Sequence, residues 1–399
     1  MLTAATRTET TPVTPFDSDR LDRLMEEAGM DAVLVTSKHN VQYLLGGHRA
    51  LFFDYMDAMG VSRYLPVMIY PKGRPEQAAY IGHRLEGHQK EVRPLWTPTT
   101  QMASSSSVDA IEKAITHLRR IGIKPRRLGI EAAFLPVDAA AALHAAFPKA
   151  EAIDAVFVLE RLRALKRPEE LELLRTASEL VIDSMEAVIA QHGPGSTKKE
   201  IAEALRREET ERGLVFEYCL IAAGSSHNRA PSQQEWREGD VLSVDSGGNY
   251  HGYIGDLARM AILGEPDAEL EDLLADIEEI QRAAMKPIRA GAMGAEIYAA
   301  GEARLAKSRQ HNSLEFLAHG MGLVSHEAPH LTASGPVPYG DDDARRPLEE
   351  GMVISVETTL HHPRRGFIKL EDTVAVTPDG HEVYGDRARG WNRGGIALR

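Results

Sequence analysis

Residues 239–260 decide how this chain folds. They read Gly239-Asp-Val-Leu-Ser-Val-Asp-Ser-Gly-Gly-Asn-Tyr-His-Gly-Tyr-Ile-Gly-Asp-Leu-Ala-Arg-Met260. One strand-like run ends in Asp245, a glycine-rich turn follows, and a second run carries Asp256. We therefore expect a β-hairpin that places two carboxylates side by side.

The same pattern returns later in the chain. Residues 351–358 (Gly-Met-Val-Ile-Ser-Val-Glu-Thr) repeat the pattern of residues 239–246, and another strand-like run follows at 367–374. The repeat places Glu357 and Glu371 as the two aspartates are placed. Four acids at the ends of apolar strands are costly to desolvate alone, so we expect positive charge between them. The repeat also predicts two related halves.

Composition narrows the class of protein. A chain of 399 residues is long enough for two domains, or for one large domain with an appendage. Its net charge of -13, without a stripe of Lys and Arg, argues against a nucleic-acid partner and an anionic membrane surface. No stretch approaches the roughly 18 apolar residues of a membrane span, and residues 1–15 lack the apolar core of a signal peptide.

The single cysteine, Cys219, lies in an apolar run and can form no disulfide within the chain. This pattern is typical of a reducing compartment. It also favours a buried structural thiol over a nucleophile. We therefore expect a cytoplasmic protein.

Strand and helix patterns alternate over residues 16–160, after a start (residues 1–15) that we expect to be disordered. This alternation predicts an α/β N-terminal domain. The expected helices cover residues 19–28, 108–120 and 137–146, and the expected strands cover 32–35, 66–70, 78–81 and 127–130.

Residues 161–399 are expected to form the second domain, after a charged junction in which Pro168 fits the first turn of a new helix. Thr197-Lys-Lys-Glu200 is a capping box that predicts the start of another helix. Helices alternate here with hairpins, which favours an α+β domain with an antiparallel or mixed sheet covered by helices. Its other expected elements are a strand at 216–223 and helices at 269–285 and 294–307.

A glycine-rich segment with two histidines, His319 and His326, lies between the two acid pairs. Four carboxylates with one or two imidazoles suit two divalent ions such as Mn²⁺ or Co²⁺, with Fe²⁺ and Zn²⁺ as alternatives. Two such ions about 3.5–4 Å apart can share a bridging hydroxide and polarise a carbonyl. The chemistry that this set indicates is hydrolysis.

Residues 326–330 (His-Glu-Ala-Pro-His) also spell the H-E-x-x-H motif of zinc proteases. That motif needs both histidines on one face of a helix. Pro329 disfavours the helical conformation of Ala328, so we do not favour this reading. His330 and the pair His361 and His362 are expected at the surface or at the rim of a site.

Five of these residues, in their order along the chain, resemble the pita-bread metallopeptidase family: Asp245, Asp256, His319, Glu357 and Glu371. That family includes prolidase, aminopeptidase P, methionine aminopeptidase and the metal-free creatinase. The match extends over Gly252-Tyr-Ile-Gly-Asp256-Leu-Ala-Arg259 and over His319-Gly-Met-Gly-Leu-Val-Ser-His326-Glu. The junction at 165–170 and residues 31–46 also resemble the two-domain members, which indicates the prolidase, aminopeptidase P and creatinase branch.

The resemblance implies a creatinase-like N-terminal domain, a pita-bread catalytic domain and a role for each ligand. Asp245 would chelate one metal ion, and His319 with Glu357 would hold the other. Asp256 and Glu371 would bridge the two ions.

The resemblance also assigns residues on the substrate side. His227 and His326 match two histidines that hydrogen-bond the substrate carbonyl or the oxyanion in the family. Glu357 would handle the proton of the attacking hydroxide. The alternatives are a solvated loop histidine for His227 and a structural histidine for His326.

Two positions depart from the family pattern. Its peptidases commonly follow the first glutamate with Pro-Gly and an aromatic residue, where this chain has Thr358-Thr-Leu360. They commonly place Arg two residues before the second glutamate, where this chain has Lys369, and the two side chains differ in hydrogen bonding. Both departures lie on the substrate side and leave the metal ligands intact.

The leading hypothesis is a binuclear metal hydrolase that cleaves the amide bond before proline, as an Xaa-Pro dipeptidase or aminopeptidase does. The alternative is a hydrolase or lyase for a small non-peptide amide or amidine, as creatinase and ectoine hydrolase show that the fold permits. A pseudo-enzyme would have lost metal ligands, and all five remain. The resemblance further implies a homodimer in which residues 43–53 of the partner cover the pocket.

Overall fold

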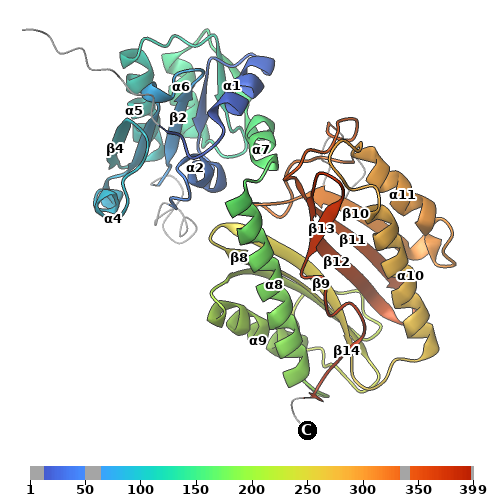
Figure 1. Ribbon diagram of the computed structural model, residues 1–399. Coiled ribbons are helices and arrows are strands. Elements are labelled where there is room, and N and C mark those ends of the chain that lie inside the picture. Colours follow the sequence, from blue (N-terminus) through green and yellow to red (C-terminus); the bar gives the residue numbers. More distant parts are fainter. Residues whose placement is uncertain (1–12, 50–63, 333–341, 397–399) are drawn as a thin grey trace, which may run out of the picture. The chain divides into compact units, whose positions relative to one another are not determined.

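The computed structural model describes residues 13–49, 64–332 and 342–396. The chain divides into two compact units, Met1–Arg163 and Ala164–Arg399 (Figure 1). The boundary expected between residues 160 and 161 falls within helix α7 (Val156–Ala164). The expectation of a disordered start lies, for residues 1–12, outside the described residues.

The N-terminal unit is an α/β domain built on one six-stranded sheet in the order β4-β3-β2-β1-β5-β6. Strand β1 pairs antiparallel with β2 and parallel with β5, so the sheet is mixed. The strands are β1 (Ala32–Val35), β2 (Val67–Pro71), β3 (Ala79–His83), β4 (Thr99–Ser104), β5 (Arg127–Ile130) and β6 (Glu151–Asp154). The helices besides α7 are α1 (Ser18–Glu27), α2 (Lys38–Leu44), α4 (Gln89–Val92), α5 (Ser107–Arg120) and α6 (Val137–Ala146).

Local signals explain the helices that the sequence predicts in this unit. The Asp17 carboxylate accepts a hydrogen bond from the Arg20 amide at the start of α1, and Ser106 does the same for α5. Apolar residues of α5 and α6 pack with the central strands in one core. The sequence did not predict α2, whose Asn40 and Gln42 are buried with the apolar residues, so the helix has no polar face to give a periodic pattern.

The C-terminal unit consists of two halves with the same order of elements, two helices followed by three strands, which confirms the predicted repeat. The eight-stranded sheet has the order β10-β11-β12-β9-β8-β7, so the halves meet where β9 pairs with β12. The first half comprises α8 (Pro168–Gln191), α9 (Lys198–Glu211), β7 (Val215–Ala223), β8 (Val241–Tyr250) and β9 (Tyr253–Ile262). The second comprises α10 (Ala268–Met285), α11 (Ala295–Leu305), β10 (Leu314–Gly320), β11 (Val353–His362) and β12 (Gly366–Val376).

Two short strands complete this sheet. Strand β13 (His381–Tyr384) pairs with β12, and β14 (Asn392–Arg393) pairs with β9. The predicted capping box is present at the start of α9, where Thr197 and Glu200 each accept a hydrogen bond from the other residue's amide. Pro168 occupies the first turn of α8 as expected.

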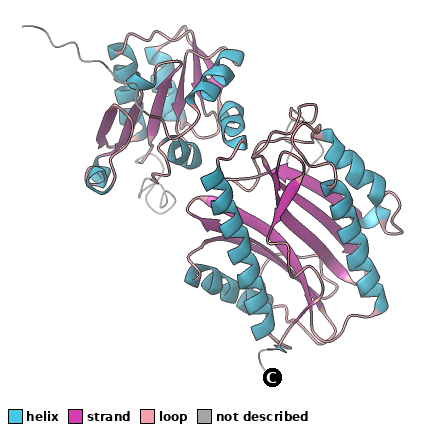
Figure 2. Ribbon diagram, viewed as in Figure 1, coloured by secondary structure: helices cyan, strands magenta, loops and turns pink. Residues whose placement is uncertain are grey.

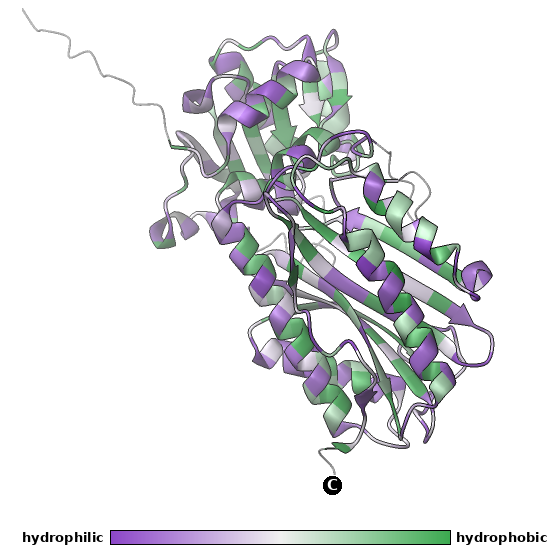
Figure 3. Ribbon diagram, turned by 45° about the vertical axis from the view of Figure 1, so that its right-hand side comes forward, coloured by the Kyte–Doolittle hydropathy of each residue, from purple (hydrophilic) through white to green (hydrophobic). Residues whose placement is uncertain are grey.

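The helices cover one face of this sheet (Figure 2). Leu242 and Val244 of β8 pack with residues of α8 and α9, and Leu360 and Leu370 of the other half pack with α10. Hydrophobic and hydrophilic residues alternate along these helices, as expected for helices with one buried face (Figure 3). Successive strand residues point to opposite faces, so Asp245, Glu357 and Glu371, which alternate with this core, point away from the helices.

One expectation about the acids is wrong. They were expected at strand ends, but all four lie in the middle of strands of 10 or 11 residues. The apolar pattern stops at Asp245 because this residue lines a pocket and Ser246, Gly247 and Gly248 follow it. Backbone pairing nevertheless continues through Ser246-Gly-Gly-Asn to Tyr250.

Among the helices of the described ranges, none combines the length and the apolar character that crossing a membrane requires.

Candidate active site

The four strands at the centre of the C-terminal sheet align the acidic side chains in one row. Asp245 of β8 lies opposite Ala258 of β9, Ala258 lies opposite Glu371 of β12, and Glu371 lies opposite Glu357 of β11. Directly opposite residues of antiparallel strands share a face. Asp256 joins this face two residues before Ala258. The methyl group of Ala258 is the smallest side chain of the row, and it leaves the space between the acids open.

The two hairpins place their acids differently, although their sequences are similar. Glu357 and Glu371 are direct partners, whereas Asp245 pairs with Ala258 and Asp256 pairs with Gly247. The two aspartates are therefore diagonal neighbours. This offset brings Asp256 toward one end of the row.

His319 enters the site from strand β10, which the sequence did not predict. It lies opposite Ser355 of β11, two residues from Glu357 on the same face. The Ser355 hydroxyl donates a hydrogen bond of 2.7 Å to the Glu371 carboxylate. The Tyr298 hydroxyl bonds the backbone of Ala318 at 2.9 and 3.0 Å and so fixes the strand beside the histidine.

The donor set fits divalent metal ions. Among the described residues, three groups have ligand atoms within 4.8 Å of one another: Asp245, Asp256 and Glu371; His319, Glu357 and Glu371; and Asp256, His319 and His326. Glu371 belongs to two groups, as expected for a bridging carboxylate. Carboxylate oxygens with an imidazole nitrogen suit Mn²⁺, Co²⁺, Fe²⁺ or Zn²⁺.

His319 presents the nitrogen that a metal requires. Its Nδ1 lies 3.2 Å from the Gly320 carbonyl oxygen, which can only accept, so we assign the proton to Nδ1. Its Nε2 is buried without a hydrogen-bond partner and lies 3.7 Å from oxygens of both Glu357 and Glu371. These distances are too long for hydrogen bonds, and they suit a cation between the three groups.

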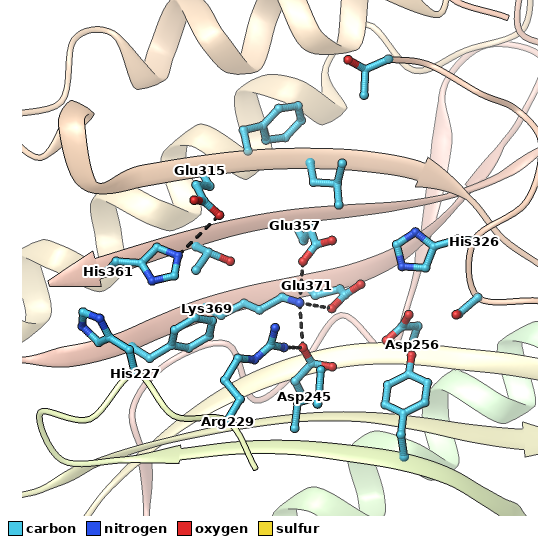
Figure 4. A pocket seen from close by; sticks show the side chains of 18 of the residues that line it. His227, Arg229, Asp245, Asp256, Glu315, His326, Glu357, His361, Lys369 and Glu371 are labelled. Carbon is cyan, nitrogen blue, oxygen red and sulfur yellow. Dashed lines mark hydrogen bonds and ion pairs between the residues drawn. The ribbon is translucent and has the colours of Figure 1, made fainter. Parts of the chain in front are cut away.

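Lys369 lies among the same acids (Figure 4). Its Nζ is 2.5 Å from Glu357, 2.7 Å from Asp245 and 2.8 Å from Glu371. Arg229 adds a second ion pair to Asp245. The positive charge that the sequence led us to expect between the acids is therefore supplied, in part, by this chain itself.

Burial and charge shift the ionisation of these groups in different directions. Burial, with the neighbouring Glu371, raises the pKa of Glu357 and raises that of Asp256 strongly. Burial also raises the pKa of Asp245, against the effect of the Lys369 ammonium. Burial opposes the charge of Glu371 as well, but Lys369 and His319 hold its pKa below the ordinary value. The set thus resembles carboxylates that need a cation to share one site.

The acids form the floor of a pocket of about 810 Å³, a volume typical of small-molecule sites. His326 lies at one end, stacked on His319 with ring centroids 3.8 Å apart. Burial and the nearby His319 lower the pKa of His326 to about 4, so its ring is neutral at pH 7. Figure 4 shows His326 beside Asp256, with His227 and His361 at the opposite end.

The structure thus brings the seven candidate site residues singled out in the sequence into one pocket or its immediate wall, but not into one cluster. His227 lines the pocket, and its Nε2 lies 3.1 Å from the His362 carbonyl oxygen. It belongs to none of the metal-binding groups found among the described residues. His361 also lines the pocket, 3.4 Å from Glu315, whereas His362 is buried and not at the surface as expected.

Other pocket residues were not identified from the sequence. Arg229 stacks its guanidinium 4.9 Å from the ring centre of Phe367, and Tyr218 contributes a hydrogen bond that lowers the pKa of Asp256 against burial. Arg229 follows His227 by two residues, but nothing in a polar loop indicates which side chain turns inward. His227 and Arg229 lie in the loop between β7 and β8, and the pairing of these two strands brings the loop to Asp245.

The segment after His319 contains no helix in its described part, 321–332, which excludes the zinc-protease geometry there. Glu327 is buried and pairs with Lys166 at 3.2 Å. It therefore has a structural partner away from the acidic row.

Comparison with known proteins supports this description. Residues 172–378 match the model of metallopeptidase family M24, and residues 18–165 match the creatinase/prolidase N-terminal domain. The probable dipeptidase PepE of Mycobacterium tuberculosis is 33% identical over 371 residues, which cover 89% of each chain. The Xaa-Pro dipeptidase of Pyrococcus horikoshii is 22% identical over 370 residues, which cover 90% of this chain and 94% of that protein.

Solved structures show the same fold over nearly the whole chain. An Xaa-Pro dipeptidase from Bacillus anthracis superposes with a TM-score of 0.78 at 24% identity and covers 94% of this chain and 98% of its own. The dipeptidase PepE from Mycobacterium ulcerans gives a TM-score of 0.76 at 22% identity, with 95% and 99% covered. The fold, the donor set and a family model that spans more than half of the sequence together show that the chain belongs to metallopeptidase family M24 and is a hydrolase.

Proposed function

We propose that this protein is a dipeptidase with two divalent metal ions, which hydrolyses the amide bond before proline in Xaa-Pro dipeptides. The row formed by Asp245, Glu371 and Glu357, flanked by Asp256 and His319, is the observation that carries the proposal. Relatives that align over most of the chain are named as dipeptidases or Xaa-Pro dipeptidases. A pocket of about 810 Å³ is large enough for such a substrate.

The groups of ligand atoms support the roles that the family resemblance implies. Asp245 would hold one ion, His319 and Glu357 would hold the other, and Asp256 and Glu371 would lie between them. Divalent ions bound by these residues would supply Lewis acidity, which would polarise the scissile carbonyl and lower the pKa of the attacking water. Mn²⁺ and Co²⁺ are the ions we propose first.

The remaining residues act on the substrate and on protons. Glu357 accepts the proton of the attacking water, because its buried carboxyl has a raised pKa and faces the pocket. His326 is neutral, and an N–H of its ring donates to the carbonyl oxygen as negative charge develops there. His227 lies at the far end of the pocket and positions the other end of the substrate.

The test combines metal analysis with hydrolysis. The purified protein should contain two equivalents of Mn²⁺ or Co²⁺ after reconstitution and should release proline from Ala-Pro and Gly-Pro, but act poorly on Ala-Ala. A protein that loads metal and leaves every Xaa-Pro dipeptide intact would overturn the peptide substrate and keep the metal centre. A protein that binds neither ion and is insensitive to chelators would overturn the metal centre as well.

A second substrate class is favoured by one observation. Thr359 and Lys369 lie opposite each other in the β11–β12 pair, and both line the pocket. The family peptidases commonly have other residues at these two positions. A small non-peptide amide or amidine would suit this more polar wall. Activity on such compounds, in a metal-loaded protein inert to dipeptides, would favour this class.

The family resemblance is also the basis for proposing a homodimer in which residues 43–53 of the partner cover the pocket. Of this segment, residues 50–53 lie outside the described residues. Light scattering of the purified protein tests the oligomeric state.

A further inference from the structure

Lys369 does not simply stand near the metal ligands. Its Nζ lies within 2.8 Å of one oxygen from each of three carboxylates, and these belong to two of the three candidate metal groups. Asp245 comes from one group, Glu357 from the other, and Glu371 from both. The ammonium therefore occupies the space that the two groups share.

The strand geometry fixes this position. Lys369 precedes Glu371 by two residues on β12, so both side chains lie on the pocket face. Lys369 lies opposite Thr359, two residues along the strands from the Glu357–Glu371 pair. Its side chain is 6% exposed, so the ammonium has exchanged its water for carboxylates.

We propose that Lys369 is a resident cation of the metal site, which holds the three carboxylates together in the metal-free protein and competes with divalent ions for them. This inference rests on the proposed metal centre and adds a residue that limits the affinity of that centre for divalent ions. When an ion binds, the ammonium moves away from the row toward the open pocket, which the long, unbranched side chain allows. No covalent step is involved.

Two consequences distinguish this role from simple positioning of ligands. Without Lys369, the metal-free protein keeps buried acids with less compensating charge, so it should be less stable. A divalent ion then no longer has to displace an ammonium from three ion pairs, so it should bind more tightly. A residue that only orients the ligands would, on removal, weaken metal binding.

The test compares Lys369→Met, Lys369→Arg and a control with the wild-type chain. Met keeps the length of the side chain and removes its charge, whereas Arg keeps the charge. The control is Lys198→Met, which removes a buried lysine of the same unit whose Nζ donates to the Asn228 carbonyl at 2.6 Å. Binding of Mn²⁺ is measured by titration calorimetry on chelator-treated protein, and stability by thermal unfolding with and without Mn²⁺.

We expect Lys369→Met to bind Mn²⁺ tenfold or more tightly than the wild type and to unfold at a lower temperature without metal. Lys369→Arg should stay close to the wild type in affinity, and Lys198→Met should not change it. Equal or weaker binding by Lys369→Met, or an equal gain in Lys369→Arg, overturns the proposal. Failure of both the wild type and Lys369→Met to bind Mn²⁺ overturns the metal centre itself.

Lys369→Met could fold only in the presence of metal, and the comparison then uses protein purified with Mn²⁺. A larger fall in unfolding temperature on chelation than in the wild type supports the resident cation. An equal or smaller fall overturns it.

Discussion

Among the described residues, Glu371 is shared by two of the three metal groups, the one with Asp245 and Asp256 and the one with His319 and Glu357. The Ser355 hydroxyl and Lys369 hold it in the row. We expect Glu371→Gln to lose both ions and to reduce activity by about 10³-fold or more, since Lewis-acid stabilisation contributes several kcal/mol. Asp245→Asn should lose one ion only, because Asp245 belongs to one group.

Metal content after dialysis, measured by mass spectrometry, checks this prediction. Glu315→Gln is the matched control, because Glu315 lines the same pocket but belongs to no metal group found among the described residues. If Glu371→Gln kept both ions, the carboxylate would not be shared.

Glu86 of the N-terminal unit gives a prediction about pH. Burial raises the pKa of this carboxyl from 4.5 to about 7, although Tyr80 donates a hydrogen bond to it. The folded protein thus holds a proton that the unfolded chain has lost between these pH values. The free energy of unfolding should therefore fall as pH rises from 4.5 to 7, by up to about 1.4 kcal/mol per pH unit.

Glu86→Gln should make this slope shallower by the contribution of this one carboxyl, and urea unfolding at pH 5, 6, 7 and 8 measures the change. The exposed Glu91 provides the control, since Glu91→Gln should leave the pH dependence as it is in the wild type. A slope of the same size in Glu86→Gln would assign the proton to another group.

At the scale of elements, the site depends on the join between β9 and β12. Ala258 stands in the row of acids and leaves room between them. Ala258→Leu would place a branched side chain in that space, so we expect loss of metal binding while the fold is kept. The control is Ala261→Leu, which points to the opposite face and should instead lower stability through overpacking of the α8 core, by about 1–3 kcal/mol. Calorimetric Mn²⁺ titration and circular dichroism separate the two effects.

The same join is braced by Arg259, which is fully buried. Its guanidinium donates to the Glu371 carbonyl at 2.8 Å and pairs with Asp372 at 2.7 Å. Arg259→Met leaves part of a buried charge network without its partner, so we expect a loss of about 3–5 kcal/mol of stability. Arg282→Met removes a half-exposed pair with Glu278 and should cost about 1 kcal/mol or less. Denaturant unfolding compares them, and equal losses would contradict the bracing role.

Sequence patterns predicted most of these elements, and the reasons for the failures are local. Caps such as Thr197 and apolar runs such as Val241 to Val244 identify elements from their own residues. Strand β10 was not predicted because its pattern, Leu-Glu-Phe-Leu-Ala-His-Gly, is set by partners on β11 and by the pocket. The continuation of β8 through Gly247 and Gly248 was missed because a glycine pair usually marks a turn.

For the whole molecule, the repeat could be predicted because it is written in the sequence, and the family resemblance named the five candidate ligands, which stay a prediction. The diagonal offset of the two aspartates, the inward turn of Arg229 and the contacts of Lys369 could not. They depend on strand register and on side chains that come from different elements.

All candidate ligands belong to the C-terminal unit, so metal should stabilise that unit selectively. A ligand at 100 times its Kd adds about 2.7 kcal/mol to the stability of the form that binds it. In scanning calorimetry of the full chain, Mn²⁺ should shift the transition of the unit Ala164–Arg399 upward and leave that of Met1–Arg163 in place. The Glu86→Gln variant, altered in the N-terminal unit, identifies which transition is which through its pH dependence. Two transitions that shift upward together would contradict selective stabilisation of the C-terminal unit, and a shift of the N-terminal transition alone would contradict the placement of the metal site.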